Sequence, residues 1–275
     1  MIEAKILVHT KNPYTGVELI TYQCTYHRFI LPEVNTYRMI SKNSASSRGI
    51  PITKRIEQVV TNPAMPVEWG MNQKGMVAYN TVPPETEEEA CRLWREAAQK
   101  AVEYAYALNK LNIHKQLANR ILEPFVWQTS VFTGNRQWFE HIFNQRIHPE
   151  AQPEFRELAK KMKEALDNSI PVRQNFHIPY ILPQEKESLD IMTQAMVSVA
   201  RCARVSYTPF NEETANVSKD LELYQRLKNA VPPHLSPFEH VVVAAHTTAN
   251  FFNLCSFISF RWMMERPMEP EKFFR

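Results

Sequence analysis

Glycine is scarce in this chain, and its scarcity limits the cofactor sites that the fold can contain. Only five glycines occur in 275 residues. None stands in the G-x-G-x-x-G turn of a dinucleotide-binding fold or in the G-x-x-x-x-G-K-[ST] loop that cradles phosphates in nucleotide hydrolases. A bound phosphate would therefore be held by arginine, serine and asparagine side chains or by helix N-termini.

The length and charge of the chain favour an ordinary globular protein. Hydrophobic residues make up 44% and charged residues 22% of the sequence, and the length allows one large domain or two small ones. The 32 basic and 29 acidic residues leave a net charge of only +3. A single-stranded nucleic-acid binder that stacks bases on its aromatic residues is therefore the weaker alternative, and we expect no nucleic-acid partner.

The cysteines and the N-terminal segment favour a cytoplasmic location. No C-x-x-C pair occurs, so neither structural zinc nor a dithiol redox centre is expected, and isolated thiols are typical of a reducing compartment. The N-terminus does not read as a signal peptide, and no apolar run approaches the ~18 residues of a membrane span. All four cysteines are expected to be small core residues, with Cys24 in a strand and Cys91, Cys202 and Cys255 in helices.

Strand-like and helix-like patterns do not alternate regularly, which predicts an α+β fold with an antiparallel sheet packed against several long helices. Residues 4–9 and 18–31 are expected to form a hairpin around a turn at 13–16. Residues 61–84 contain several prolines and little periodicity, so they are expected to form a long loop. The short apolar run at 241–245 is expected to form a buried strand. Helices are expected at 85–111, 113–121, 130–146, 151–168, 187–202, 217–229 and 250–265, with a polar loop at 207–216.

A proline-rich stretch at 171–183 separates two halves, 1–170 and 184–275. We expect them to form one composite domain.

Residues 36–48, the Ser/Arg loop, are rich in groups that bind phosphate. Several hydroxyls and the amide of Asn43 accompany Arg38 and Arg48. Guanidinium groups offer paired donors to phosphate, and short hydroxyls add further donors. Without other information, a polar surface loop with a helix cap remains the competing interpretation.

Two further segments contain residue types that often serve in sites. His234, Glu239 and His240 lie within seven residues, but their spacing matches no common zinc signature, and a turn fixed by Pro237 with Phe238 in the core is the alternative. Arg120 and Arg146 lie among apolar residues. A buried arginine needs either an ion-pair partner or an anionic ligand.

Taken together, these segments resemble the flavin-dependent thymidylate synthases, and the resemblance touches most of the chain. That family's R-H-R-x-x-S-x-N-x-x-S-x-R signature is matched at Arg38, Ser41, Asn43, Ser46 and Arg48, whereas Thr36 and Tyr37 replace its first Arg and its His. Residues 203–207 (A-R-V-S-Y) and 234–240 (H-L-S-P-F-E-H) match two more of its motifs, and 119–124 and 135–152 match two others in part.

The order of the motifs differs from that of the family. There, the A-R-V-S and S-P-F-E-H motifs precede the Ser/Arg signature, whereas here they follow it. Asn135 and Arg146 are eleven residues apart, and so are Asn250 and Arg261. The chain therefore resembles a permuted or partly duplicated member, in which 250–266 is either a degenerate repeat or a chance similarity.

The resemblance implies a thymidylate synthase-like methyltransferase that needs no cysteine nucleophile. In that family, FAD carries a one-carbon unit from methylenetetrahydrofolate to position 5 of dUMP, with NADPH as reductant, and homotetramers share each site between subunits. We expect no metal and no membrane partner.

The resemblance also implies residue roles. It places Arg146, Ser46 and His240 in catalysis; Arg48, Ser46, Arg120, Arg146, Ser44 and Gln137 in substrate binding; and Arg38, Tyr37, Ser41, Asn43, Ser206, His240 and His141 in cofactor binding. Arg146 would face the pyrimidine ring, where its charge would stabilise negative charge that develops there.

Several positions depart from the family pattern. Thr36 and Tyr37 replace residues that help to hold FAD, while Ser44 stands where Glu is usual and Gln137 where Arg is frequent. Three alternatives therefore stay open: hydroxymethylation of dUMP, a reaction on dCMP for modified DNA, and an inactive relative that binds nucleotide without flavin.

Overall fold

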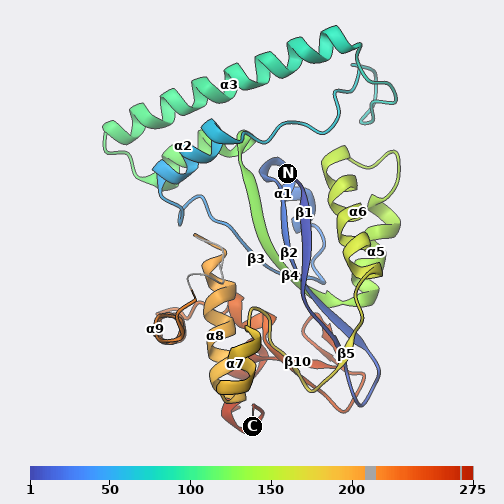
Figure 1. Cartoon of the computed structure of the whole chain (residues 1–275), viewed down its shortest axis with the longest axis vertical. Helices are drawn as coiled ribbons and strands as arrows, with labels where there is room; N and C mark the ends of the chain where they lie inside the picture. The colour runs from blue at the N-terminus through green and yellow to red at the C-terminus, as the bar shows by residue number, and fades with distance from the viewer. Residues whose placement is uncertain (208–214, 267, 275) are drawn as a thin grey trace.

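The computed structural model describes residues 1–207, 215–266 and 268–274. A central sheet separates a helical layer at one end from the C-terminal helices at the other (Figure 1). The expected polar loop at 207–216 falls almost wholly outside the described residues. In the part of the chain that is described, no helix is long and apolar enough to cross a bilayer.

The predicted N-terminal hairpin is confirmed. Strands β1 (Glu3–Lys11) and β2 (Glu18–His27) pair in antiparallel register. Asn12 shapes the connection, because its Oδ1 accepts hydrogen bonds from the backbone N–H groups of Tyr14 (2.8 Å) and Thr15 (3.1 Å). Beyond His27 the expected strand gives way to η1 (Arg28–Ile30) and α1 (Leu31–Asn35).

The main sheet has five strands in the order β3-β4-β2-β1-β5, and only β5 (Val172–Arg173) runs parallel to its neighbour. β4 (Trp127–Asn135) lies between β2 and β3 (Ser41–Ser44). The helix expected at 130–146 was therefore wrong in its first part, because its aromatic and β-branched residues build a central strand. The helix begins only at Arg136.

Two helices cover one face of this sheet (Figure 1). They are α5 (Arg136–Arg146) and α6 (Pro153–Asp167), in good agreement with the helix expected at 151–168. Their apolar faces pack on β1, β2 and β4. This packing of helices on one face of a mainly antiparallel sheet makes the fold α+β, as predicted. The core of this layer includes Tyr22, Tyr26, Phe139, Phe155, Leu158 and Met162.

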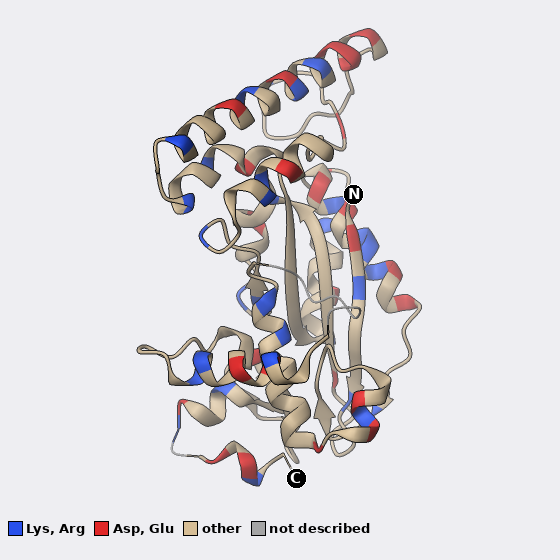
Figure 2. Ribbon diagram, turned by 60° about the vertical axis from the view of Figure 1, so that its left-hand side comes forward, with Lys and Arg blue, Asp and Glu red and all other residues tan. Residues whose placement is uncertain are grey.

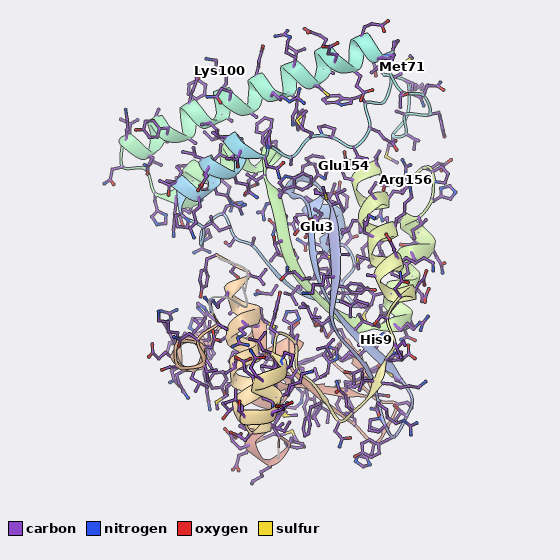
Figure 3. The ribbon with its side chains drawn as sticks, viewed as in Figure 1. Glu3, His9, Met71, Lys100, Glu154 and Arg156 are labelled. Atoms are coloured by element: carbon purple, nitrogen blue, oxygen red, sulfur yellow. The ribbon has the colours of Figure 1, made fainter. Side chains whose placement is uncertain are left out.

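The N-terminal end of α6 holds the long loop at 61–83 in place. Glu154 Oε1 accepts a hydrogen bond of 2.9 Å from the backbone N–H of Val67, and Arg156 pairs with Glu68. Glu154 and Arg156 both lie at the end of α6 nearest this loop (Figure 3). The predicted loop is confirmed, apart from one bridge between Gly70 and Thr81.

A second helical layer lies beyond the end of the sheet. α2 (Ile52–Thr61) packs between the 27-residue α3 (Pro84–Lys110) and the sheet end, which confirms the long helix expected from Glu85. The helix expected at 113–121 is instead a short α4 (Lys115–Ala118) followed by the 3-10 helix η2 (Asn119–Phe125). Pro124 within η2 prevents a regular α-helix there.

The second half contains a smaller core. α7 (Pro183–Ser188), α8 (Ile191–Arg204) and α9 (Val217–Asn229) surround η4 (Ser236–His240) and a sheet of order β10-β7-β6. These three strands are Phe257–Ser259, Val242–Ala244 and Phe176–His177, so the strand expected at 241–245 is confirmed. α9 matches the expected helix at 217–229.

The helix expected at 250–265 was wrong over most of its length. β8 (Asn250–Phe251), β9 (Leu254–Cys255) and β10 come first, then α10 (Phe260–Met264), with η5 (Pro270–Lys272) near the end. Phe252 and Ser256 adopt positive φ angles, which stop a helix and create the turns. Cys255 therefore lies in a strand and is only half-buried, as is Cys91 in α3.

Hydrogen bonds join the two halves. Asn12 Nδ2 donates to the carbonyls of Ala245 (3.0 Å) and Ser256 (2.7 Å), and Asn135 Nδ2 donates to that of Cys255 (2.9 Å). Asn12 and Asn135 are themselves buried. Buried amides require such partners, so each half completes the hydrogen bonding of the other.

Candidate functional site

The Ser/Arg loop is tied directly to the A-R-V-S-Y segment. Asn43 Nδ2 donates to the carbonyl of Cys202 (2.5 Å), and the backbone N–H of Ser46 donates to the carbonyl of Ser206 (2.9 Å). Gly49 makes this approach possible, because a Cβ atom there would lie 2.9 Å from the Ser206 carbonyl oxygen. Two motifs that are more than 150 residues apart therefore share one wall.

A cavity of about 930 Å³, the large cavity, opens beside this wall. The first half contributes Asn43, Ser46 and Arg48, and the second half contributes Ser206 and the segment 233–237. The volume lies in the upper part of the range found for small-molecule sites, ~300–1,000 Å³. The lining also includes Arg226 of α9, Arg261 of α10 with the following Glu265, and His114 and Gln116 at the start of α4.

The large cavity carries positive charge that the protein itself does not balance. Arg48 and Arg226 are exposed, and neither side chain has a hydrogen-bond or ion-pair partner among the described residues. On the left of Figure 2, several blue Lys and Arg positions lie on the ribbon between the upper helices and the C-terminal helices. Two free guanidinium groups on one cavity are suited to an anionic ligand.

Arg261 has a different environment at the same cavity. Its Nε donates to Glu265 Oε1 (2.6 Å), and its Nη1 pairs with Glu239. The two carboxylates more than balance its charge, so this end of the cavity offers both donors and acceptors rather than net positive charge. Such an end is suited to a polar, uncharged ring or a sugar hydroxyl.

A second, smaller cluster forms around Tyr37. Tyr37 and Arg38 line a cavity of about 240 Å³ together with Trp138 and His141. Arg146 Nε donates to the Tyr37 hydroxyl (2.7 Å), and the Arg146 guanidinium lies 4.7 Å from the centre of the Phe155 ring. Arg146 is thus half-buried against aromatic rings and does not line the large cavity.

The remaining substrate-binding candidates lie outside both cavities. Arg120 forms an ion pair with Glu123 (2.8 Å), as the ion-pair alternative predicts. Its apolar neighbours in the sequence suggested a buried side chain, but Arg120 is exposed. Gln137 is exposed on α5. Ser44 Oγ hydrogen bonds to Ser130 Oγ (2.7 Å), and Ser41 Oγ accepts from Asn253 Nδ2 (2.9 Å).

His240 is fully buried and does not line the large cavity. Its Nδ1 hydrogen bonds to Thr133 Oγ1 (2.8 Å), while its Nε2 has no partner. Burial lowers the pKa of His240 to about 3, so the imidazole is neutral at pH 7. The turn interpretation of 234–240 is confirmed, because Pro237 and Phe238 are both buried. His234 instead lines the large cavity.

A chain of buried hydrogen bonds continues from Thr133. Thr133 Oγ1 bonds to Thr21 Oγ1 (2.6 Å), which bonds to His177 Nε2 (2.6 Å), and His177 Nδ1 bonds to Thr10 Oγ1 (2.8 Å). All four side chains are fully buried. This chain satisfies polar groups where the two sheets meet.

Sequence reasoning missed Arg226, His114 and Gln116. Arg226 lies at an exposed position of an amphipathic helix, and a charged side chain in such a position normally indicates only a solvated face. The sequence indicates Arg261 only as part of a possible repeat of the Asn135–Arg146 segment. None of these residues carries a local signal, because the fold alone brings them to the large cavity.

No group of three or more His, Cys, Asp or Glu side chains is placed to hold a metal ion among the described residues. The two buried cysteines, Cys24 and Cys202, are not suited to act as reactive thiolates. Burial raises the pKa of both Cys24 and Cys202 well above its usual range.

Solved structures with a similar fold include the UMP/dUMP methylase PolB from Streptomyces cacaoi bound with 5-Br UMP. It is 15% identical, with a TM-score of 0.51, and the match covers 60% of this chain and 88% of that one. A second PolB structure, bound with 5-Br dUMP, is 17% identical with a TM-score of 0.46 over 54% of this chain. There the match spans 66% of PolB, slightly less than two thirds.

The flavin-dependent thymidylate synthase ThyX from Helicobacter pylori, complexed with FAD and dUMP, is 18% identical. Its TM-score is 0.36, over 54% of this chain and 67% of that one. No curated protein matches this chain in sequence.

The family model of the thymidylate synthase complementing protein matches residues 14–172. This range includes the Ser/Arg loop, Arg120 and the segment from Asn135 to Arg146. It covers more than half of the 275 residues. The chain therefore belongs to the thymidylate synthase complementing protein family.

Proposed function

We propose that this protein transfers a one-carbon unit from methylenetetrahydrofolate to position 5 of a deoxypyrimidine monophosphate, converting dUMP to dTMP with FAD and NADPH. The large cavity is the observation that carries the proposal. It brings Ser46, Arg48 and Ser206, three positions of the family motifs, to one site of suitable size. Family membership and the PolB fold, whose structure contains 5-Br UMP, support a pyrimidine nucleotide as substrate.

The phosphate end of the substrate is assigned to Arg48 and Arg226. Both guanidinium groups line the large cavity without a protein counter-charge, and Ser46 adds a hydroxyl beside Arg48. A phosphate accepts several charge-assisted hydrogen bonds at once. The base end is assigned to the Arg261–Glu265 pair, which can donate to a ring carbonyl and accept from a ring N–H.

The residues near Tyr37 fit part of a flavin. Tyr37, Trp138 and His141 supply ring faces, and Arg38 supplies a charge for a phosphate. About 240 Å³ is less than the ~300 Å³ at the lower end of the range for small-molecule sites, so this cluster would hold only one portion of FAD. When bound, reduced FAD would supply the carbon carrier and the reducing equivalents, and the protein residues would position the reactants.

We infer that a complete site uses residues from more than one copy of the chain. Arg146 and the Tyr37 cluster do not line the large cavity of their own chain, whereas the family resemblance assigns Arg146 to the pyrimidine ring. A homotetramer that shares its sites would bring them together. Within each copy, the interlocking amides of Asn12 and Asn135 support one composite domain.

The proposal is tested by a titration of flavin absorbance. The purified protein is supplied with FAD, and dUMP, dCMP or UMP is added in separate cells. We expect dUMP to shift the flavin band, and mass spectrometry of the reaction with methylenetetrahydrofolate and NADPH to detect dTMP.

A shift with dCMP alone, or a hydroxymethyl product, would replace the proposed reaction with one of the alternative modifications. If dUMP binds but flavin does not, the chain is a nucleotide-binding relative that has lost the reaction.

A further inference from the structure

A buried arginine without a counter-charge lies on the other side of the wall that bounds the large cavity. Arg55, on α2, is 3% exposed. Its Nη1 donates to Gln58 Oε1 (2.8 Å) and to the carbonyl of Trp127 (3.3 Å). Its Nη2 is buried and has no hydrogen-bond partner. A native guanidinium rarely remains in that state, because burial of an unpaired charge is costly.

No carboxylate of the described residues forms an ion pair with Arg55. Glu123 is the acidic group that attracts it, but Glu123 already accepts hydrogen bonds from Arg28 (3.1 Å) and Arg120 (2.8 Å) and from the Ser47 hydroxyl (2.5 Å). Burial and, to a smaller extent, the nearby Arg28 lower the pKa of Arg55 to about 10. The group is still charged at pH 7, so its charge remains unbalanced.

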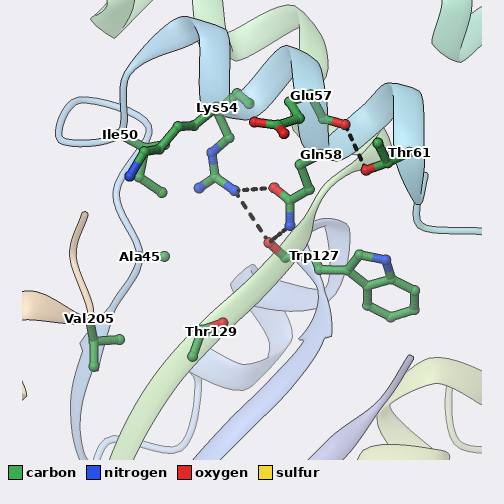
Figure 4. Close-up of a pocket in the computed structure, with 10 residues that line it drawn as sticks. Ala45, Ile50, Lys54, Glu57, Gln58, Thr61, Trp127, Thr129 and Val205 are labelled. Atoms are coloured by element: carbon green, nitrogen blue, oxygen red, sulfur yellow. Dashed lines mark hydrogen bonds between the residues drawn. The ribbon is translucent and has the colours of Figure 1, made fainter. Parts of the chain in front are cut away.

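Arg55 lines a cavity of about 410 Å³, called here the Arg55 cavity. Lys54, Gln58 and Thr129 supply further polar groups, and Trp127 and Ile50 supply apolar walls. Figure 4 shows Lys54, Gln58 and Thr129 around the opening, with Trp127 beside them. The exposed Glu57 is the only acidic residue among the described residues that line it.

The Arg55 cavity and the large cavity lie back to back. Ala45 and Val205 line the first, whereas their neighbours Ser46 and Ser206 line the second. Ala45 and Ser46 follow β3, and Val205 and Ser206 lie in the turn that follows α8, so neighbouring residues of each segment face the two sides of the wall. The hydrogen bond between Ser46 and Ser206 is part of the wall between the two cavities.

We propose that the Arg55 cavity is a second anion site that binds the phosphate of a phosphate monoester whose organic part packs on Ile50 and Trp127. The donors around it, a guanidinium, an ammonium and a threonine hydroxyl, match the several acceptor oxygens of a phosphate. The volume exceeds what a bare phosphate fills and lies within the range for small organic ligands. This site is separate from the proposed nucleotide site and does not depend on it.

The test uses thermal unfolding and isothermal titration calorimetry with phenyl phosphate, in the full chain carrying Arg48→Ala. That substitution weakens phosphate binding at the large cavity, so that the Arg55 cavity dominates. Benzoate is the carboxylate probe with the same ring, and sodium chloride at matched ionic strength controls for general salt effects. We expect phenyl phosphate to raise the unfolding midpoint and benzoate to do so much less.

Adding Arg55→Gln to this background should raise the dissociation constant of phenyl phosphate at least about tenfold, because a charge-assisted pair of donors is lost. Arg95→Gln, a neutralisation at an exposed position on α3, is the matched control and should leave the constant unchanged. Arg55→Gln removes an unbalanced buried charge, so the fold should persist. Arg55→Lys keeps the positive charge but loses the paired N–H donors of the guanidinium, so its dissociation constant for phenyl phosphate should be intermediate.

Equal binding to the Arg55→Gln and control proteins would overturn the proposal, as would the absence of any binding by phenyl phosphate. Equal binding of benzoate would overturn the phosphate assignment in favour of a general anion site. Binding of dUMP to the chain with Arg48 restored is measured in parallel. Arg55→Gln should leave the affinity for dUMP unchanged. The two assays therefore test the Arg55 cavity and the proposed nucleotide site separately.

Discussion

The backbone N–H of Ser46 donates a hydrogen bond of 2.9 Å to the carbonyl oxygen of Ser206. This bond joins the Ser/Arg loop of the first half to the end of α8 in the second half. Both residues also line the large cavity. The relative position of the two halves therefore determines the geometry of the proposed nucleotide site.

Arg48→Ala should weaken dUMP binding by about 10- to 100-fold, because one charge-assisted contact to the phosphate is lost. The fold should be little affected, since Arg48 is exposed and has no protein partner among the described residues. Isothermal titration calorimetry with dUMP and with deoxyuridine measures the effect. The deoxyuridine affinity should stay constant, and an equal loss for both ligands would contradict a phosphate role.

Arg226→Ala should also weaken dUMP binding, although Arg226 lies outside the segment matched by the family model. The expected loss is again about tenfold, with a reduced dependence of binding on salt. Arg95→Ala on α3 is the control for a general loss of positive charge. If the two variants bind dUMP equally well, Arg226 is only a surface residue.

Gly49→Ala should destabilise the wall between the halves. A Cβ at this position would lie 2.9 Å from the Ser206 carbonyl oxygen, so the backbone must shift. We expect a loss of about 1–3 kcal/mol in the free energy of unfolding, measured in urea, together with weaker dUMP binding. Unchanged stability and affinity would show that the two segments adjust independently.

Arg201→Met should be among the most destabilising substitutions. The Arg201 side chain is fully buried and bonds to Glu185 (2.6 Å) and Asp220 (2.8 Å). Its removal takes the ion-pair partner from the buried Glu185 and leaves Asp220 with Arg204 alone, which costs about 3–5 kcal/mol. Urea unfolding measures the loss. Arg204→Met is the control, because Arg204 is partly exposed and makes one ion pair with Asp220; a loss as large for Arg204 would contradict this assignment.

Acid should destabilise the fold between about pH 6.5 and pH 3. Burial lowers the pKa of His177 and of His240 to about 3 from the usual 6.5. Below pH 6.5 the unfolded chain binds protons at both positions and the folded chain does not. Each histidine should therefore lower the free energy of unfolding by up to about 1.4 kcal/mol per pH unit as the pH falls.

Urea unfolding at several pH values measures this slope. His177→Gln should reduce the slope by about one proton, whereas His148→Gln, at an exposed position, should leave it unchanged. An unaltered slope in His177→Gln would mean that His177 is not neutral in the folded protein.

Local patterns in the chain predict the α+β class, the hairpin, the long helix α3 and the segments that carry the family motifs. Each of these has a local cause: alternating or 3.6-residue periodicity, a turn at 13–16, or a run of specific side chains. The family assignment rests on such segments and is confirmed over residues 14–172.

The strands within 127–135 and 250–259 depend on long-range pairing and could not be predicted from local patterns. Both stretches contain aromatic residues that suit a helix or a strand, and pairing with β2, β3 and β7 makes them strands. The structure also decided where each arginine lies. Arg48 and Arg226 reach one cavity, Arg146 packs against Tyr37, and Arg55 is buried without a counter-charge. Distance in the chain carries no information about these environments, because long-range packing creates them.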